Sequence, residues 1–63
     1  MTDLAIRIVI PAHNEEMTIS TVVSFASDYG SVLVIDDAST DKTAHIASSL
    51  GALVKSLPNN VGY

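Results

Sequence analysis

The chain has 63 residues, of which 48% are hydrophobic, and it contains no cysteine. A chain this short buries only about 60% of the surface that its unfolded form exposes, and without cysteine no disulfide or thiolate-bound metal can stabilise it. Its hydrophobic fraction is high for a disordered chain, which indicates a packed core. Three Lys and Arg residues against seven Asp and Glu residues give a net charge of -4. Without a basic patch, nucleic-acid binding is not expected.

The first ten residues, MTDLAIRIVI, do not have the character of a targeting segment. They contain an aspartate and a central arginine, and their apolar stretch is too short to span a membrane. We therefore expect a cytoplasmic chain with no membrane segment.

The first predicted element is a β-strand over residues 5–10, AIRIVI. Its nearly continuous run of β-branched residues is typical of a strand that is buried on both faces. Pro11 is expected to end this strand, because proline cannot donate to the hydrogen-bond ladder of a sheet.

A helix is predicted next. Asn14 is a good N-cap residue, and Glu15 and Glu16 would fall in the first turn, where negative charge suits the helix dipole. Gly30 stands where a glycine commonly closes a helix. The predicted buried face recurs at helical spacing and comprises Ile19, Val22, Val23 and Ala26.

A second strand, a second helix and a third strand complete the pattern. The strands are predicted over residues 31–36, SVLVID, and 52–57, ALVKSL. The helix between them lies in STDKTAHIASSLG, with Ser39 or Asp41 as its cap and Gly51 at its end. Its predicted buried face comprises Thr43, Ile46, Ala47 and Leu50.

This alternation predicts an α/β fold, β-α-β-α-β, which is half of a doubly wound, mostly parallel, Rossmann-like sheet. Ligands bind such sheets at the carboxyl ends of the strands. Both polar clusters of the sequence follow a strand there: PAHNEE after the first and DDAST after the second. We therefore expect their side chains to meet at one pocket.

The residues of that pocket suit the nucleoside end of a nucleotide. Neither the G-x-G-x-x-G fingerprint nor a G-K-[ST] phosphate loop is present. Carboxylates are poor direct ligands for phosphate, but they accept hydrogen bonds from ribose hydroxyls and from the N3–H of uracil, and they bind metals that carry phosphates. The imidazole of His13 could stack on a base.

Three motifs together resemble the N-terminal segment of family 2 glycosyltransferases: IVIPAHNEE, VLVIDDASTDKT with the helix that follows it, and LPNNVGY. The closest resemblance is to the branch of dolichyl-phosphate mannose synthases and other polyprenyl-phosphate sugar transferases. It covers nearly the whole chain and implies an A-type glycosyltransferase fold. Such enzymes move a sugar from a nucleotide diphosphate donor to an acceptor.

The resemblance also implies roles for single residues. Pro11, Ala12 and His13 match the strand exit that packs against the nucleobase, and His13 stands where the family often has tyrosine. Glu15 matches an acid that contacts the nucleoside. Asp37 matches the carboxylate that hydrogen-bonds the base, with Asp36 beside it as a weaker candidate. The loop that leads to the family's next helix is matched by Asn59, Asn60 and Gly62.

The chain departs from the family in what it lacks. The family's metal-binding D-x-D motif and its catalytic base have no counterpart in these 63 residues. We therefore expect a single partial domain over residues 1–63 that contributes a nucleoside pocket, with no catalytic residue and no metal ligand of its own. The divalent Mg or Mn expected for full-length relatives would be bound elsewhere in the domain.

Two other hypotheses remain open from the sequence. The chain could be a non-catalytic nucleotide- or metal-binding module, as response-regulator receivers are, although its third strand ends in Ser56, Leu57 and Pro58 without the expected aspartate. It could also be a vestigial fragment with no ligand. In the glycosyltransferase topology, later strands would flank the first strand, so the isolated chain would expose an apolar edge that favours self-association.

Overall fold

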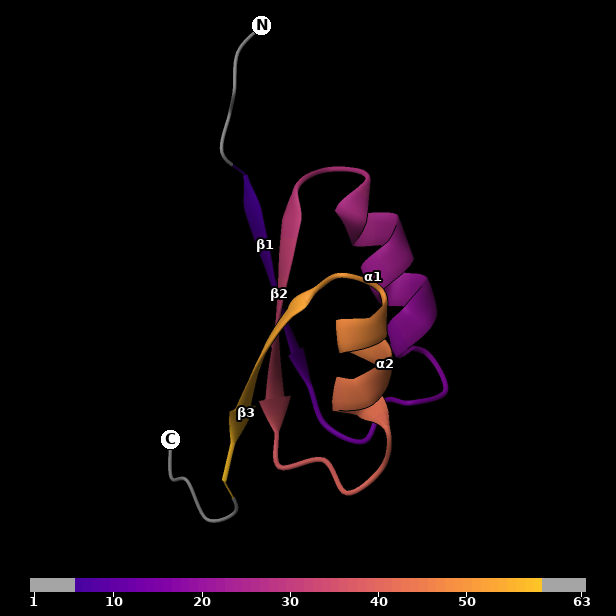
Figure 1. Cartoon of the computed structure of the whole chain (residues 1–63), viewed down its shortest axis with the longest axis vertical. Helices are drawn as coiled ribbons and strands as arrows, with labels where there is room; N and C mark the ends of the chain where they lie inside the picture. Colours follow the sequence, from indigo (N-terminus) through magenta and orange to yellow (C-terminus); the bar gives the residue numbers. More distant parts are fainter. Residues whose placement is uncertain (1–5, 59–63) are drawn as a thin grey trace, which may run out of the picture.

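The predicted order of elements is confirmed. The structure, a computed structural model, describes residues 6–58. Its three strands are parallel and lie side by side in the order β1-β2-β3 (Figure 1). The elements in chain order are β1 (Arg7–Ala12), α1 (Ile19–Ser27), β2 (Ser31–Asp37), α2 (Thr43–Ser49) and β3 (Leu53–Leu57).

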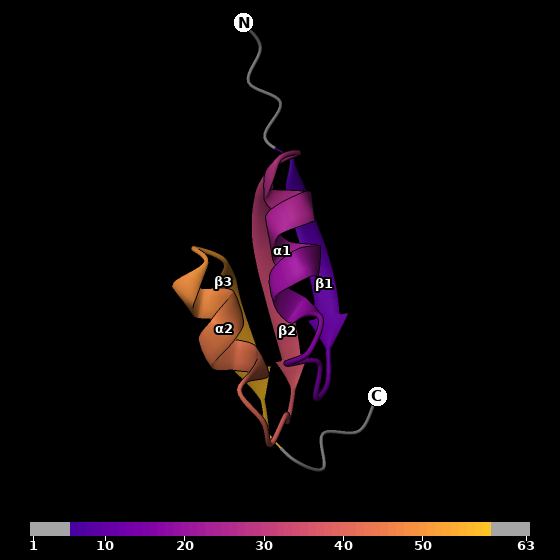
Figure 2. The ribbon, with the colours of Figure 1, turned by 90° about the vertical axis from the view of Figure 1, so that its right-hand side faces the viewer.

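Both helices cover the same face of the sheet, as the two views show (Figures 1 and 2). The strand order advances in one direction, and parallel crossovers share one hand, so both connecting helices fall on one side. Neither α1 nor α2 is long and apolar enough to cross a membrane. The layer of helices therefore rests on one side of the sheet, and the carboxyl ends of the strands point to a common edge.

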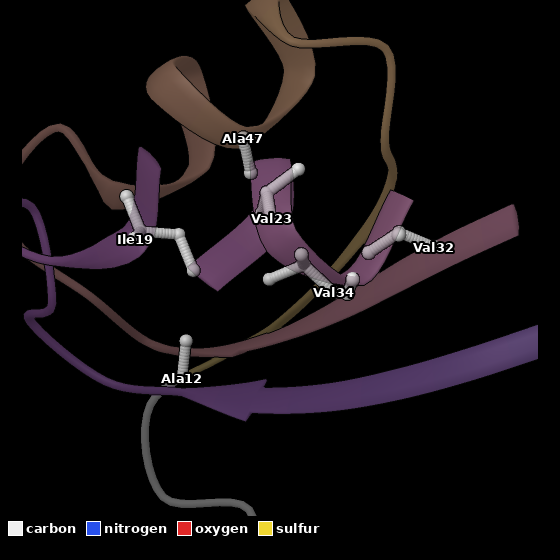
Figure 3. Close-up of a cluster of buried hydrophobic side chains, with 7 residues drawn as sticks. Ala12, Ile19, Val23, Val32, Val34 and Ala47 are labelled. Carbon is white, nitrogen blue, oxygen red and sulfur yellow. The ribbon is translucent and has the colours of Figure 1, made fainter. Parts of the chain in front are cut away.

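The hydrophobic core lies between the helices and this face (Figure 3). Ile19 and Val23 of α1 are each 1% exposed and pack over Val34 of β2, which is fully buried. The predicted faces of both helices are largely confirmed, although Val22 and Leu50 lie at their margins and are more than 40% exposed. Side chains of the core are Ala12, Ile19, Val23, Ala26, Val32, Val34 and Ala47.

None of the residues 6–58 covers the opposite face of the sheet, so the prediction of a first strand buried on both sides is wrong for this part of the chain. Val9 and Leu53 flank Leu33 across the three strands. Val9 and Leu53 are each 55% exposed. Burial alternates along the strands because successive side chains point to opposite faces. An apolar row therefore faces outward.

Pro11 does not end β1, which continues to Ala12. β1 pairs with β2 alone among the described strands. Proline is tolerated in such an edge strand when its nitrogen points away from the neighbouring strand. The prediction that Pro11 terminates the strand is thus wrong, and the extra two residues bring Ala12 opposite Asp36.

Asn14 is not the cap of α1, and this prediction is wrong as well. The helix begins at Ile19 with Thr18 as its N-cap, and no acidic residue lies in its first turn. The carbonyl of Glu15 already accepts from the N–H of Ile19 at 2.8 Å. Glu15 and Glu16 therefore belong to the loop that precedes the helix.

The two glycines that follow the helices have different roles. Gly51 closes α2 as predicted: its φ is +92°, and the N–H groups of Gly51 and Ala52 donate to Ser48 and Ala47, as in a Schellman motif. Gly30 does not cap α1, whose C-cap is Asp28. A Cβ atom at Gly30 would lie 2.5 Å from the carbonyl oxygen of Ile6, so glycine is needed there for close approach of two backbones.

The uncovered sheet predicts self-association of the isolated chain, since the free edge of β1 and the apolar row beside it offer surface for a second copy. Sedimentation velocity at increasing concentration should show species larger than a monomer. Val9→Lys places a charge in β1 and should shift the distribution towards monomer.

Met17→Lys is the matched control, because Met17 is 89% exposed but lies outside the sheet. A compact monomer at high concentration, or equal effects of the two lysine substitutions, would contradict the prediction.

Candidate functional site

The loops that leave β1 and β2 lie together at the carboxyl edge of the sheet. Ala12 and Asp36, the register partners near the ends of these strands, bring the two exits side by side. Each exit contains a non-glycine residue in the left-handed region, Asn14 with φ 52° and Ala38 with φ 53°. Such backbone conformations are unfavourable for residues with a side chain and concentrate at functional sites.

Asn14 is bonded to the second loop through both its backbone and its side chain. Its N–H donates to the hydroxyl oxygen of Ser39 at 2.8 Å. Its Oδ1 accepts from the N–H of Thr40 at 2.8 Å and from the Thr40 hydroxyl at 3.4 Å. These bonds replace the helix cap predicted for Asn14 with a connection between two loops.

The two glutamates that follow extend this connection to the start of α2. The N–H of Glu15 donates to Thr43 Oγ1 at 2.8 Å, and the N–H of Glu16 donates to Asp41 Oδ2 at 3.2 Å. In return, the N–H of Lys42 donates to Glu16 Oε1 at 3.0 Å. Asp41 also accepts from the N–H and hydroxyl of Thr43, the first residue of α2. The N-cap of α2 is Lys42, so the prediction of Ser39 or Asp41 as the cap is wrong, although Asp41 binds the start of the helix.

His13 lies against the end of β2. Its Nδ1 is 2.5 Å from the backbone carbonyl oxygen of Asp37, and the imidazole is exposed. The Asp37 side chain is half-buried, and its carboxylate takes part in none of the hydrogen bonds found among residues 6–58. The two strand exits thus lie in contact, and His13 binds the backbone of the residue whose carboxylate makes no hydrogen bond among residues 6–58.

Asp36 is oriented differently from Asp37. Successive residues of β2 point to opposite faces, and Asp36 shares the helix-covered side with Val34. It is only 4% exposed, and its buried Oδ1 has no hydrogen-bond partner among residues 6–58. Burying an oxygen without a hydrogen bond lowers the stability of the fold. Asp36 is therefore less accessible to a ligand than Asp37, which is only half-buried.

A shallow hollow of about 240 Å³ opens between β1 and α1. Of the predicted site residues it includes Pro11, Ala12 and Glu15, but neither His13 nor Asp37. Pro11 and Glu15 are exposed, whereas Ala12 is buried, and Glu15 Oε1 accepts from the Thr18 hydroxyl at 3.3 Å. The hollow thus includes chain neighbours of His13 but not the His13–Asp37 contact itself, and we place the centre of the site at that contact.

Sequence reasoning missed Thr43 and Ser39 as residues that hold the site together. Thr43 is fully buried on the helix face where apolar residues are expected. A buried hydroxyl needs a hydrogen-bond partner. The threonine on the predicted apolar face was therefore the sign in the sequence that another segment binds there. His45 is exposed, as predicted. The predicted loop residues Asn59, Asn60 and Gly62 lie outside the described residues.

No metal centre is formed by the part of the chain that the structure describes. Among residues 6–58 there is no group of three or more His, Asp or Glu side chains that could hold a metal ion. The divalent ion expected for the full-length family therefore finds no such group of ligands among the described residues.

Comparison with known proteins agrees with this geometry. The family model described as glycosyl transferase family 2 matches residues 7–63. The chain belongs to glycosyl transferase family 2. It is also similar to Protein RfbJ of Shigella flexneri, with 39% identity over 56 residues, which cover 84% of this chain and 43% of RfbJ. The chain thus spans less than half the length of that relative. No solved structure matches it significantly.

Within this family 2 segment, Asp41 is the carboxylate whose ionisation is most clearly tied to the fold. The Thr43 hydroxyl that donates to it, helped by the N–H groups of Thr43 and Glu16, holds the pKa of Asp41 below its ordinary value of 3.8, against a smaller opposing effect of burial. A depressed pKa stabilises the folded state above the unfolded pKa. That contribution is lost as the pH falls through the folded pKa.

Acidification should therefore lower the free energy of unfolding below pH 3.8, and Asp41→Asn should make this decrease smaller, because an amide keeps an acceptor oxygen but does not titrate. Urea unfolding at a series of pH values, followed by circular dichroism, measures the effect. Asp28→Asn, at the far end of α1, is the control. Identical pH profiles for Asp41→Asn and the unmodified chain would contradict the assignment.

Proposed function

We propose that this chain forms the nucleoside-binding part of a glycosyltransferase that uses a nucleotide diphosphate-sugar donor. The observation that carries the proposal is the contact between His13 and the end of β2, at the edge where open parallel sheets bind ligands. Family membership supports sugar transfer as the reaction of the whole domain. The name of RfbJ alone assigns no donor or acceptor.

The chemistry of the exposed groups favours the nucleoside over the phosphates. The Asp37 carboxylate can accept from a base N–H or a ribose hydroxyl, and the exposed ring of His13 offers a face for stacking. With a net charge of -4, the chain is poorly suited to hold a diphosphate. Pro11 and Glu15 flank the same edge and complete the proposed contact surface.

Ala12 and Asp36 have a supporting role in this proposal. Both are 4% exposed, and they are register partners beneath the two exits. Their side chains face the helix-covered side, so in this proposal they hold the ends of the two strands in place, while the direct polar contact comes from Asp37. The buried Oδ1 of Asp36 lacks a partner in the described residues, so a donor brought by the rest of the domain or by the ligand would stabilise it.

The finer assignment follows the motif resemblance. We propose that the domain acts in the cytoplasm and belongs to the polyprenyl-phosphate sugar transferase branch, with the acceptor, the divalent metal and the catalytic base bound or supplied outside these 63 residues. The motifs IVIPAHNEE and VLVIDDASTDKT support this branch. Within this proposal, the segment binds the donor and performs no bond cleavage by itself.

Titration of the ¹⁵N-labelled chain with UDP and with GDP should shift amide resonances of residues 11–15 and 36–39. Asp37→Ala should weaken this binding about tenfold or more, because a hydrogen bond to a charged group contributes about 1.5–3 kcal/mol. Asp28→Ala removes a carboxylate remote from the site and should leave the affinity unchanged. Shifts that are the same in Asp37→Ala and in the unmodified chain would refute the proposed site.

A further inference from the structure

The amide of Asn14 lies between the second loop and the ring of His13. Its Oδ1 is 2.8 Å from the backbone nitrogen of Thr40, and its Nδ2 is 3.3 Å from Nε2 of His13. The backbone of Asn14 is held in the left-handed region, which asparagine tolerates better than most residues. Asn14 is thus fixed by its neighbours while its side chain reaches the proposed nucleoside site.

The hydrogen-bond partners determine how this amide is oriented. A backbone N–H can only donate, so the Asn14 atom that faces Thr40 must be the carbonyl oxygen. The NH₂ group therefore faces His13. Because an NH₂ group also only donates, Nε2 of His13 must accept and cannot carry a proton.

The contact of the other ring nitrogen supplies the second half of the assignment. Nδ1 of His13 is 2.5 Å from the carbonyl oxygen of Asp37, and a carbonyl oxygen can only accept, so Nδ1 must carry the proton. Both contacts select a neutral imidazole protonated on Nδ1. In histidine, the bond that one nitrogen makes sets the state of the other.

We propose that Asn14 is a positioning residue that fixes His13 as the neutral Nδ1–H tautomer, so that His13 offers the base a stacking face and no hydrogen bond. This inference rests on the proposed nucleotide site. Both ring nitrogens are occupied within the protein, which leaves only the ring faces and C–H edges for a ligand. The hydrogen bonds that distinguish one base from another must then come from Asp37, whose carboxylate is unoccupied in the described part of the chain.

The tautomer can be measured without any nucleotide. Long-range ¹H–¹⁵N NMR of the imidazoles should show His13 protonated on Nδ1 and not on Nε2. His45, exposed on α2, is an internal reference that should show the tautomer mixture of a solvated histidine. Asn14→Asp keeps an acceptor for Thr40 but replaces the donor to His13 by an acceptor, while the Asp37 carbonyl oxygen still requires a proton on Nδ1, so both ring nitrogens of His13 should become protonated.

A double-mutant cycle tests whether Asn14 acts through His13. Asn14→Asp should weaken the binding of uridine about tenfold, the effect of losing the hydrogen bond that fixes His13. The uncharged nucleoside is the probe because a new carboxylate would repel the phosphates of UDP whether or not His13 is present. His13→Phe keeps an aromatic ring but has no ring nitrogen for Asn14 to fix, so it is the reference background of the cycle. In the His13→Phe background, Asn14→Asp should cause no further loss. Amide spectra of every variant establish that the fold is kept.

The outcomes separate the two proposals. An Nε2–H tautomer in the unmodified chain, or an equal loss from Asn14→Asp in both backgrounds, would overturn the positioning role even if UDP binds. If the tautomer is as expected but neither UDP nor GDP shifts the site resonances, the nucleotide proposal fails while the fixing of His13 by Asn14 stands.

Discussion

The hydrogen bonds between the loop after β1 and the loop after β2 are the constraint on which the site depends. Three successive amides, those of Asn14, Glu15 and Glu16, donate to side chains of the second loop and of the first residue of α2. These contacts join residues 25 to 28 positions apart. They therefore hold the two loops together as one unit at the carboxyl edge of the sheet. The position of His13 against β2 follows from this connection.

The two faces of the sheet differ, and this difference determines the environment of the residues in the two loops. One face is covered by α1 and α2 (Figure 2) and contains the core. The other face exposes an apolar row that includes Val9 and Leu53. Parallel sheets are normally covered on both faces. The alternation of β2 directs Asp36 into the covered side and Asp37 to the open side, so two adjacent carboxylates have different environments and different proposed roles.

The sequence predicted the fold class well because β-branched runs and helical spacing are local signals. It also predicted that the two polar exits meet, since the carboxyl ends of parallel strands share an edge. It failed for Asn14, because a capping rule considers nearby residues and the partners of Asn14 are Ser39 and Thr40. It failed for the first strand because composition does not reveal which neighbour covers a face. Gly30 was misassigned since its close approach to Ile6 is a tertiary contact.

Amide hydrogen exchange tests the connection between the two loops most directly, because it reports on the individual N–H groups that donate across it. We predict slow exchange for the N–H groups of Asn14, Glu15 and Glu16, comparable to that of paired amides in β2, although Asn14 and Glu15 are exposed. Thr43→Val, which removes the acceptor of the Glu15 amide, should accelerate exchange at Glu15. Exchange of these three amides at the rate of an unstructured loop, with β2 still protected, would contradict the account.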